Sequence, residues 1–97
     1  MTSFNEYGLN KKILISLNEL GFKQPTPIQA KVIPNLISSE QDIIASAQTG
    51  TGKTGAFGIP IIHLNNHSSK NTQTLIMCPT RELCIQITND LINFSKH

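Results

Sequence analysis

The 97-residue sequence has no long apolar run and few charged residues. Its N-terminal stretch, MTSFNEYGLNKK, lacks an apolar core of signal-peptide length, and no segment approaches the roughly 20 apolar residues of a membrane span. Charged residues make up 14% of the chain, and its net charge of +2 comes from scattered side chains. This dispersed charge does not by itself indicate nucleic-acid binding. A hydrophobic content of 38% favours a soluble α/β protein over a disordered tail.

Cysteine is also scarce. The two cysteines, Cys78 and Cys84, have the spacing of neither a metal site nor a redox motif. We therefore expect buried thiols in a reducing compartment, with the cytoplasm as the default location. Cys84 is expected to pack in the core.

Apolar spacing predicts four helices. The first carries Leu9, Ile13, Leu17 and Leu20 on one face and ends at Gly21. The second begins with Thr26 as N-cap and runs toward Ile37, with a kink or break near Pro34. The third follows a glycine-rich stretch and extends to Leu64, although Gly55, Gly58 and Pro60 are poor helix formers. The fourth follows Thr80, with an apolar face of Leu83, Ile87, Leu91 and Phe94.

Two short apolar segments, 42–46 and 74–78, are predicted to be buried parallel strands. Between the first of these and the third helix lies AQTGTGKT, residues 47–54. The order strand, glycine-rich loop, GKT and helix is typical of a phosphate-binding P-loop. Lys53 is predicted to contact the β and γ phosphates, and the Thr54 hydroxyl to bind magnesium. The pattern departs from the strict P-loop at its first position, which is Ala47.

Thr26 and Gln29 have the spacing of a capping box, in which both side chains satisfy free N–H groups at a helix start. From the residues alone, this structural role is favoured for Gln29. In the same way, Arg81 alone is better explained as a surface residue at an ordinary strand-to-helix turn.

Together, GFKQPTPIQ at 21–29, AQTGTGKT at 47–54 and PTREL at 79–83 resemble the DEAD-box RNA helicases, whose motifs occur in this order. An isolated aromatic, Phe4, precedes them, and the resemblance extends from it to the last helix. It implies an α/β fold: residues 1–97 would be the N-terminal portion of a RecA-like P-loop NTPase domain, a parallel sheet flanked by helices. The Q motif would span about 2–30, the P-loop 47–54 and motif Ia 79–83.

The resemblance also implies site residues. Gln29 would hydrogen-bond the adenine edge, and Phe4 would stack on the base. The nucleotide ATP, with Mg²⁺, would be bound by the P-loop residues Ala47, Gln48, Thr49, Gly50, Thr51, Gly52, Lys53 and Thr54, the last two being catalytic. The backbone of RNA, without regard to base sequence, would be contacted by Pro79, Thr80 and Arg81.

The sequence contains neither a Walker B aspartate, nor the DEAD tetrapeptide, nor a serine-alanine-threonine motif. ATP hydrolysis needs such acidic residues and an arginine finger. We therefore expect an N-terminal part of a helicase that works with a second RecA-like domain and that is inactive alone. A non-catalytic ATP-binding module and a different P-loop enzyme, such as a kinase or transport ATPase, remain alternatives. No membrane partner is expected.

Overall fold

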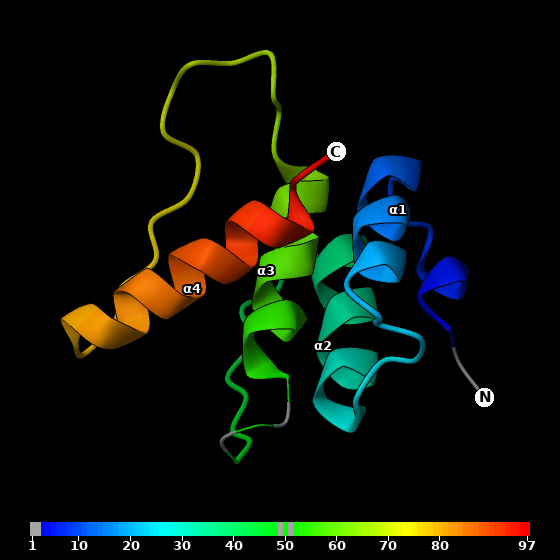
Figure 1. Ribbon diagram of the computed structural model, residues 1–97, viewed down its shortest axis with the longest axis horizontal. Coiled ribbons are helices and arrows are strands. Elements are labelled where there is room, and N and C mark those ends of the chain that lie inside the picture. Colours follow the sequence, from blue (N-terminus) through cyan, green and yellow to red (C-terminus); the bar gives the residue numbers. More distant parts are fainter. Residues whose placement is uncertain (1–2, 49, 51) are drawn as a thin grey trace.

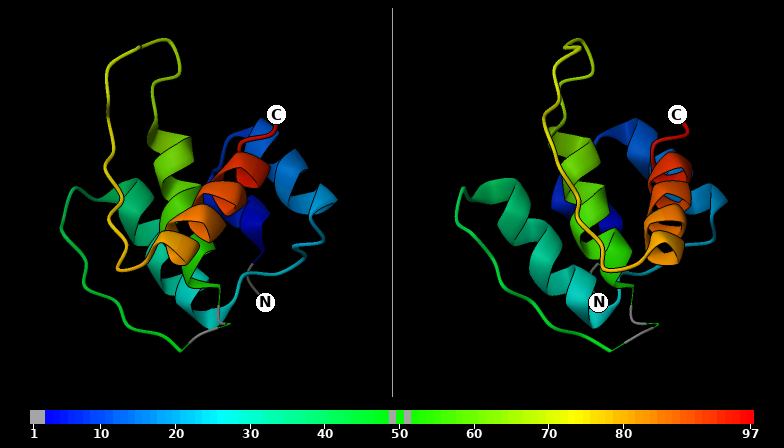
Figure 2. Two further views of the ribbon diagram at one scale, coloured as in Figure 1. Left: turned by 60° about the vertical axis from the view of Figure 1, so that its left-hand side comes forward. Right: turned by 90° about the vertical axis from the view of Figure 1, so that its left-hand side faces the viewer.

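Helix α3 (Lys53–Leu64) is the central element of the protein. The computed structural model describes residues 3–48, 50 and 52–97. In it, α3 packs against α2 (Pro27–Ser38) on one side and α4 (Arg81–Phe94) on the other, and α4 also packs against α1 (Lys11–Glu19) (Figure 1). A short 3-10 helix, η1 (Phe4–Tyr7), precedes α1. The arrangement brings the starts of α2 and α3 to one end of the molecule (Figures 1 and 2).

The core lies where these helices meet. It is formed by apolar side chains from every helix and from the segment before α1: Phe4, Leu9, Ile13, Leu17, Ile33, Ile59 and Phe94. The expected faces of the first and last helices are thus largely confirmed, although Leu83 of the last helix is 37% exposed. Leu20, placed on the first buried face by its spacing, is instead 40% exposed because α1 ends at Glu19.

Side chains cap three of the four α-helices, as the sequence predicts for two of them. Thr26 Oγ1 accepts a hydrogen bond from the Gln29 N–H at 3.4 Å, and Thr80 Oγ1 accepts one from the Leu83 N–H at 3.2 Å. Asn10 Oδ1 does the same for Lys12 at 2.8 Å. Each satisfies an N–H group that has no partner within its own helix.

The sequence predicts a kink or a break near Pro34. A break is wrong, because α2 runs without interruption from Pro27 to Ser38. A proline inside a helix removes one backbone hydrogen bond. Two side chains make additional bonds beside it: Asn35 Nδ2 donates to the Lys31 carbonyl at 2.6 Å, and Ser38 Oγ donates to the Pro34 carbonyl at 2.7 Å. The packing of α2 on α3 keeps the helix continuous.

Two glycines of α3, unfavourable for a helix by sequence, are explained by close contacts. A β-carbon on Gly58 would lie 2.7 Å from Leu91 Cδ2, so glycine permits the close approach of α4. A β-carbon on Gly55 would lie 2.7 Å from Gln29 Nε2, so glycine there makes room for a side chain of α2. The cost of glycine in a helix, about 1 kcal/mol each, is offset by this packing.

The two predicted strands are not formed. Segments 42–46 and 74–78 are irregular, and no strand occurs in the described ranges. Both run along the outside of the helices as open loops (Figure 2). A strand needs a neighbour to satisfy its N–H and C=O groups, and neither segment has one. Several of their apolar side chains are consequently in solvent, with Leu75 80% and Met77 86% exposed.

Among the described residues, no helix has the length and apolar character needed to cross a lipid bilayer.

Candidate functional site

The start of α3 differs from that of the other three α-helices. Its N-cap is Gly52, which supplies no side-chain acceptor, and both Gly50 and Gly52 have φ of +83°. Residues with a β-carbon rarely adopt such angles, so these positions need glycine. The first N–H groups of α3 are therefore left for an external acceptor, at the positive end of the helix dipole. This is the geometry of an anion site suited to phosphate.

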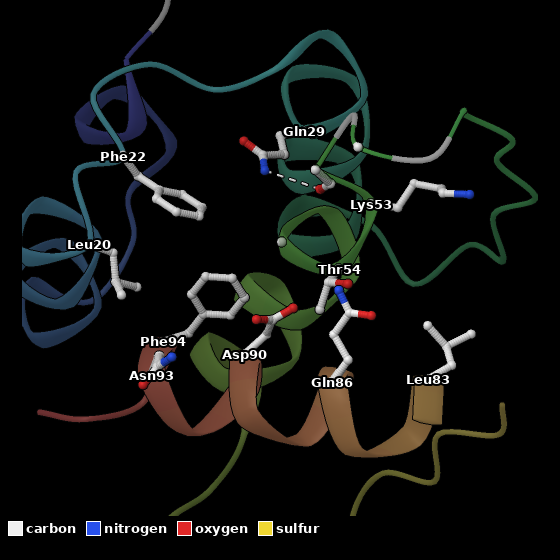
Figure 3. A pocket seen from close by; sticks show the side chains of 13 residues that line it. Leu20, Phe22, Gln29, Lys53, Thr54, Leu83, Gln86, Asp90, Asn93 and Phe94 are labelled. Carbon is white, nitrogen blue, oxygen red and sulfur yellow. Dashed lines mark hydrogen bonds between the residues drawn. The ribbon is translucent and has the colours of Figure 1, made fainter. Parts of the chain in front are cut away.

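Gln29 joins this loop to α2. Its side chain is 2% exposed and makes two hydrogen bonds. Oε1 accepts from the Thr26 N–H at 3.0 Å, which completes the capping box, and Nε2 donates to the Gly52 carbonyl at 3.1 Å (Figure 3). The capping role favoured from the residues alone is thus confirmed. An amide has two hydrogens and two lone-pair sites, so one donor and one acceptor position are not used by these bonds.

A cavity of about 450 Å³ lies between the loop before α3, the end of α1 and one face of α4. Of the nucleotide-binding residues expected from the sequence, those that line it are Gln29, Gly50, Gly52, Lys53 and Thr54. The described residues Phe4, Ala47 and Gln48 are not part of its lining, and Thr49 and Thr51 lie outside the described residues. The structure therefore brings four of the six described residues of 47–54 together with Gln29.

Phe4 and Phe22 lie close to one another, but of the two only Phe22 lines the cavity. Phe4, expected against a base, is only 4% exposed and packs in the core, its ring centroid 6.4 Å from that of Phe22. Phe22 is half-buried, packs against the core and also lines the cavity (Figure 3). The aromatic surface available in this cavity thus comes from Phe22 and from Phe94, whose ring centroids are 5.7 Å apart. Stacking of Phe4 on a base stays a prediction.

Polar residues of α4 were not anticipated as part of this site. Gln86, Asp90 and Asn93 line the cavity from the side opposite Gln29 (Figure 3). They recur every three or four residues, which puts them on one helical face beside the apolar one. This periodicity is the sequence signal that could have identified the polar face of α4. It does not show that the face lines the cavity, because that depends on the close approach of α3 and α4 at Gly58.

Two exposed cations flank the site. Lys53 is the first residue of α3, and its side chain extends away from α4 (Figure 3). Arg81 is the first residue of α4, beside the exposed residues Pro79 and Thr80. Within the described part of the chain, neither cation has an ion-pair partner. Leu83, in the first turn of α4, lines the same cavity as Lys53, so the starts of α3 and α4 adjoin one cavity.

A model of the DEAD/DEAH box helicase family matches residues 26–97. The chain belongs to this family. The ATP-dependent RNA helicase CshA of Listeria monocytogenes is 52% identical over 99 residues, which cover 100% of this chain and 19% of that protein. The chain thus spans about a fifth of the length of this curated relative. Membership in the DEAD-box family sets aside the alternative of an unrelated P-loop kinase or transport ATPase.

Solved DEAD-box structures have the same arrangement of helices. A DEAD box protein from the hyperthermophile Methanococcus jannaschii is 41% identical, with a TM-score of 0.93 over 98% of this chain and 26% of that one. Dbp5 of S. cerevisiae, solved bound to RNA and ADP BeF3, is 31% identical, with a TM-score of 0.94 over 99% of this chain and 25% of that one.

Proposed function

We propose that this chain is the ATP-binding N-terminal part of a DEAD-box RNA helicase, which couples ATP binding and hydrolysis to the unwinding of RNA duplexes. The observation that carries the proposal is the uncapped start of α3, with Gly50 and Gly52 at positive φ and Gln29 fixed against it. Its relatives are ATP-dependent RNA helicases by name. In this reading, 1–97 belongs to the first of two RecA-like domains, and the second is a partner in the intact protein.

The residues present fit a magnesium nucleotide. The open N–H groups of α3 and the unpaired Lys53 ammonium would hold the β and γ phosphates, and the Thr54 hydroxyl would be a ligand of Mg²⁺. When bound, Mg²⁺ supplies positive charge to the phosphates. The unused donor and acceptor positions of the Gln29 amide suit an adenine edge, which also offers one of each.

The two unpaired segments fit the same proposal. We infer that 42–46 and 74–78 become strands of a RecA-like parallel sheet when the rest of the domain supplies the strands between them. Their exposed apolar side chains, such as Leu75, would then be buried. We further propose the cytoplasm as the location, in keeping with free rather than bridged cysteines in the described chain.

Gln29→Ala in the intact protein is expected to weaken ATP binding more than GTP binding, by roughly 1–3 kcal/mol for a lost buried hydrogen-bonding group. The matched control is Thr26→Ala, which removes the capping hydroxyl but keeps the amide that faces the nucleotide. That variant is expected to weaken both nucleotides equally. Titrations with fluorescent ATP and GTP analogues measure this. If Gln29→Ala also weakens both equally, Gln29 acts only as a capping and loop-holding residue, and its assignment to adenine is wrong.

Arg81→Ala is expected to weaken RNA binding by the same factor for unrelated RNA sequences, because a contact to phosphate carries no base information. The slope of log Kd against the logarithm of salt concentration should also decrease by roughly 0.7, the value for one phosphate contact to a single strand. Binding of two unrelated RNAs at several salt concentrations tests this, with Lys70→Ala, an exposed lysine of the long loop, as control. An effect that depends on RNA sequence, or an unchanged salt dependence, would remove Arg81 from the RNA site.

A further inference from the structure

The amide nitrogen of Gln29 lies against two glycines, one at the end of the phosphate loop and one in the first turn of α3. A β-carbon on Gly52 would lie 2.6 Å from Gln29 Nε2, and one on Gly55 would lie 2.7 Å from the same atom. Both distances are far shorter than a van der Waals contact. Neither position therefore has room for a side chain while the amide stays where it is.

The two glycines are needed for different reasons. Gly52 has φ of +83°, an angle that by itself favours glycine. Gly55 has the backbone of an ordinary helical residue, and at such a position alanine is the better helix former. The backbone conformation thus gives no reason for glycine at position 55. The close approach of the Gln29 amide does give one.

The amide has no equivalent place to move to. Gln29 is 2% exposed, and both ends of its amide are bonded: Oε1 to the Thr26 N–H at 3.0 Å and Nε2 to the Gly52 carbonyl at 3.1 Å (Figure 3). The Gly52 carbonyl also accepts the Ala56 N–H at 3.1 Å. A displaced Nε2 would leave this carbonyl with its helix bond alone. A side chain at position 55 would therefore break the bond that ties the phosphate loop to α2.

We propose that Gly55 is a positioning residue for nucleotide binding, because its lack of a side chain seats the Gln29 amide against Gly52 and so holds the phosphate loop. This inference rests on the function proposed above, in which the loop binds phosphates. A loop that is already held loses less conformational entropy when a ligand binds. Because the phosphates are common to all nucleotides, the contribution of Gly55 does not depend on the base.

Gly55→Ala in the intact protein tests the proposal. Binding of fluorescent ADP and GDP, each with Mg²⁺, is measured by titration. We expect both dissociation constants to rise by the same factor, roughly fivefold, which corresponds to about 1 kcal/mol for one lost hydrogen bond. Helix propensity alone would act in the opposite direction, since alanine favours the helix. Unchanged affinities, or a loss confined to ADP, would overturn the proposal.

A double-mutant cycle shows whether Gly55 acts through Gln29. In Gln29→Ala there is no amide left to displace, so adding Gly55→Ala should change neither dissociation constant further. Such non-additivity is expected of two residues in direct contact. If the new methyl group weakens binding as much in the Gln29→Ala background, it obstructs the loop or the nucleotide directly. That outcome would overturn the positioning role.

Gly58→Ala is the matched control, because it makes the same change one turn further along the same helix. The nearest neighbours of a β-carbon there belong to α4, with Leu91 Cδ2 at 2.7 Å, the mobile end of a side chain. We expect both nucleotide affinities to stay at the wild-type value. A loss equal to that of Gly55→Ala would trace the effect to α3 in general and would contradict a specific seat for the amide.

The seat itself is measured without nucleotide. The side-chain amide of Gln29 is observed by NMR in protein labelled with ¹⁵N-glutamine and is identified by its absence in Gln29→Ala. We expect its hydrogens to exchange with solvent faster in Gly55→Ala than in the wild type, and equal exchange rates would overturn the seating. If the intact wild type binds neither nucleotide, the proposed function fails, and the exchange rates still decide whether Gly55 holds the amide.

Discussion

Replacing Lys53 with alanine in the intact protein will abolish ATP hydrolysis. The side chain is exposed at the first position of α3, beside N–H groups that no side chain caps. Its ammonium has no ion-pair partner in the described ranges, so its charge is available to a ligand. Loss of a group that stabilises developing charge in a transition state typically lowers the rate by about 10²–10³-fold. Phosphoryl transfer depends especially on such positioning and charge.

The measurement is steady-state ATP turnover with saturating RNA, followed by equilibrium binding of ATP to the same variant. Lys11→Ala is the control, since Lys11 is an exposed lysine at the start of α1 and does not line the cavity. It should leave turnover unchanged. Turnover at the wild-type rate in Lys53→Ala would contradict the P-loop assignment itself. Normal ATP binding with lost turnover would instead place the contribution of Lys53 in the transition state.

The isolated 97-residue chain is expected to show no sharp cooperative thermal transition. Ile44, Leu75 and Met77 are almost entirely in solvent, on segments with no strand partner. Burial of such a side chain contributes about 1.5–3 kcal/mol, so these three alone forgo roughly 5–9 kcal/mol. A small domain has only about 5–15 kcal/mol of net stability. The loss is therefore of the same order as the whole, and exposed apolar segments also favour aggregation.

Circular dichroism during heating, with and without magnesium ATP, tests this expectation. Leu75→Ser serves as the comparison. In the isolated chain it should have no effect on helix content, because Leu75 contacts mainly water there. In the intact protein it should be destabilising by about 1.5–3 kcal/mol if Leu75 becomes buried. A sharp melting transition of the isolated chain, with a midpoint raised by magnesium ATP, would mean that the chain is an independent nucleotide-binding module.

Local sequence signals predicted the helices well, but they did not predict the contacts between helices or the side chains that line the cavity. Thr26 and Thr80 mark helix starts by a hydroxyl that reaches an N–H group three residues ahead, which sequence spacing reveals directly. The fit of Gly55 and Gly58 could not be predicted in this way, because it depends on Gln29 and Leu91 from other helices. Sequence position likewise does not distinguish which of Phe4 and Phe22 faces the cavity.

The strands show the same limit more clearly. Segments 42–46 and 74–78 have the apolar character of buried strands, but a strand exists only when another backbone lies beside it. Apolar character can be read from the segment itself, whereas strand pairing depends on a second segment elsewhere in the chain. The family motifs assign the site residues as whole patterns, and those assignments stay predictions. The spacing of Thr26 and Gln29 alone predicted the capping box, which is confirmed.

The bonds of Gln29 to both Thr26 and Gly52 have a thermodynamic consequence. One amide holds the backbone around which phosphates would bind and also faces the space proposed for the base. If contact with a base shifts this amide, its hydrogen bond to the Gly52 carbonyl changes. Binding of phosphate at the loop in turn changes the position of Gly52 and therefore the same hydrogen bond. Such linkage is reciprocal, with the same coupling free energy in both directions. The affinities of this protein for the base and for the phosphates of one nucleotide are therefore not independent quantities, and neither can be obtained by subtracting the other from the whole.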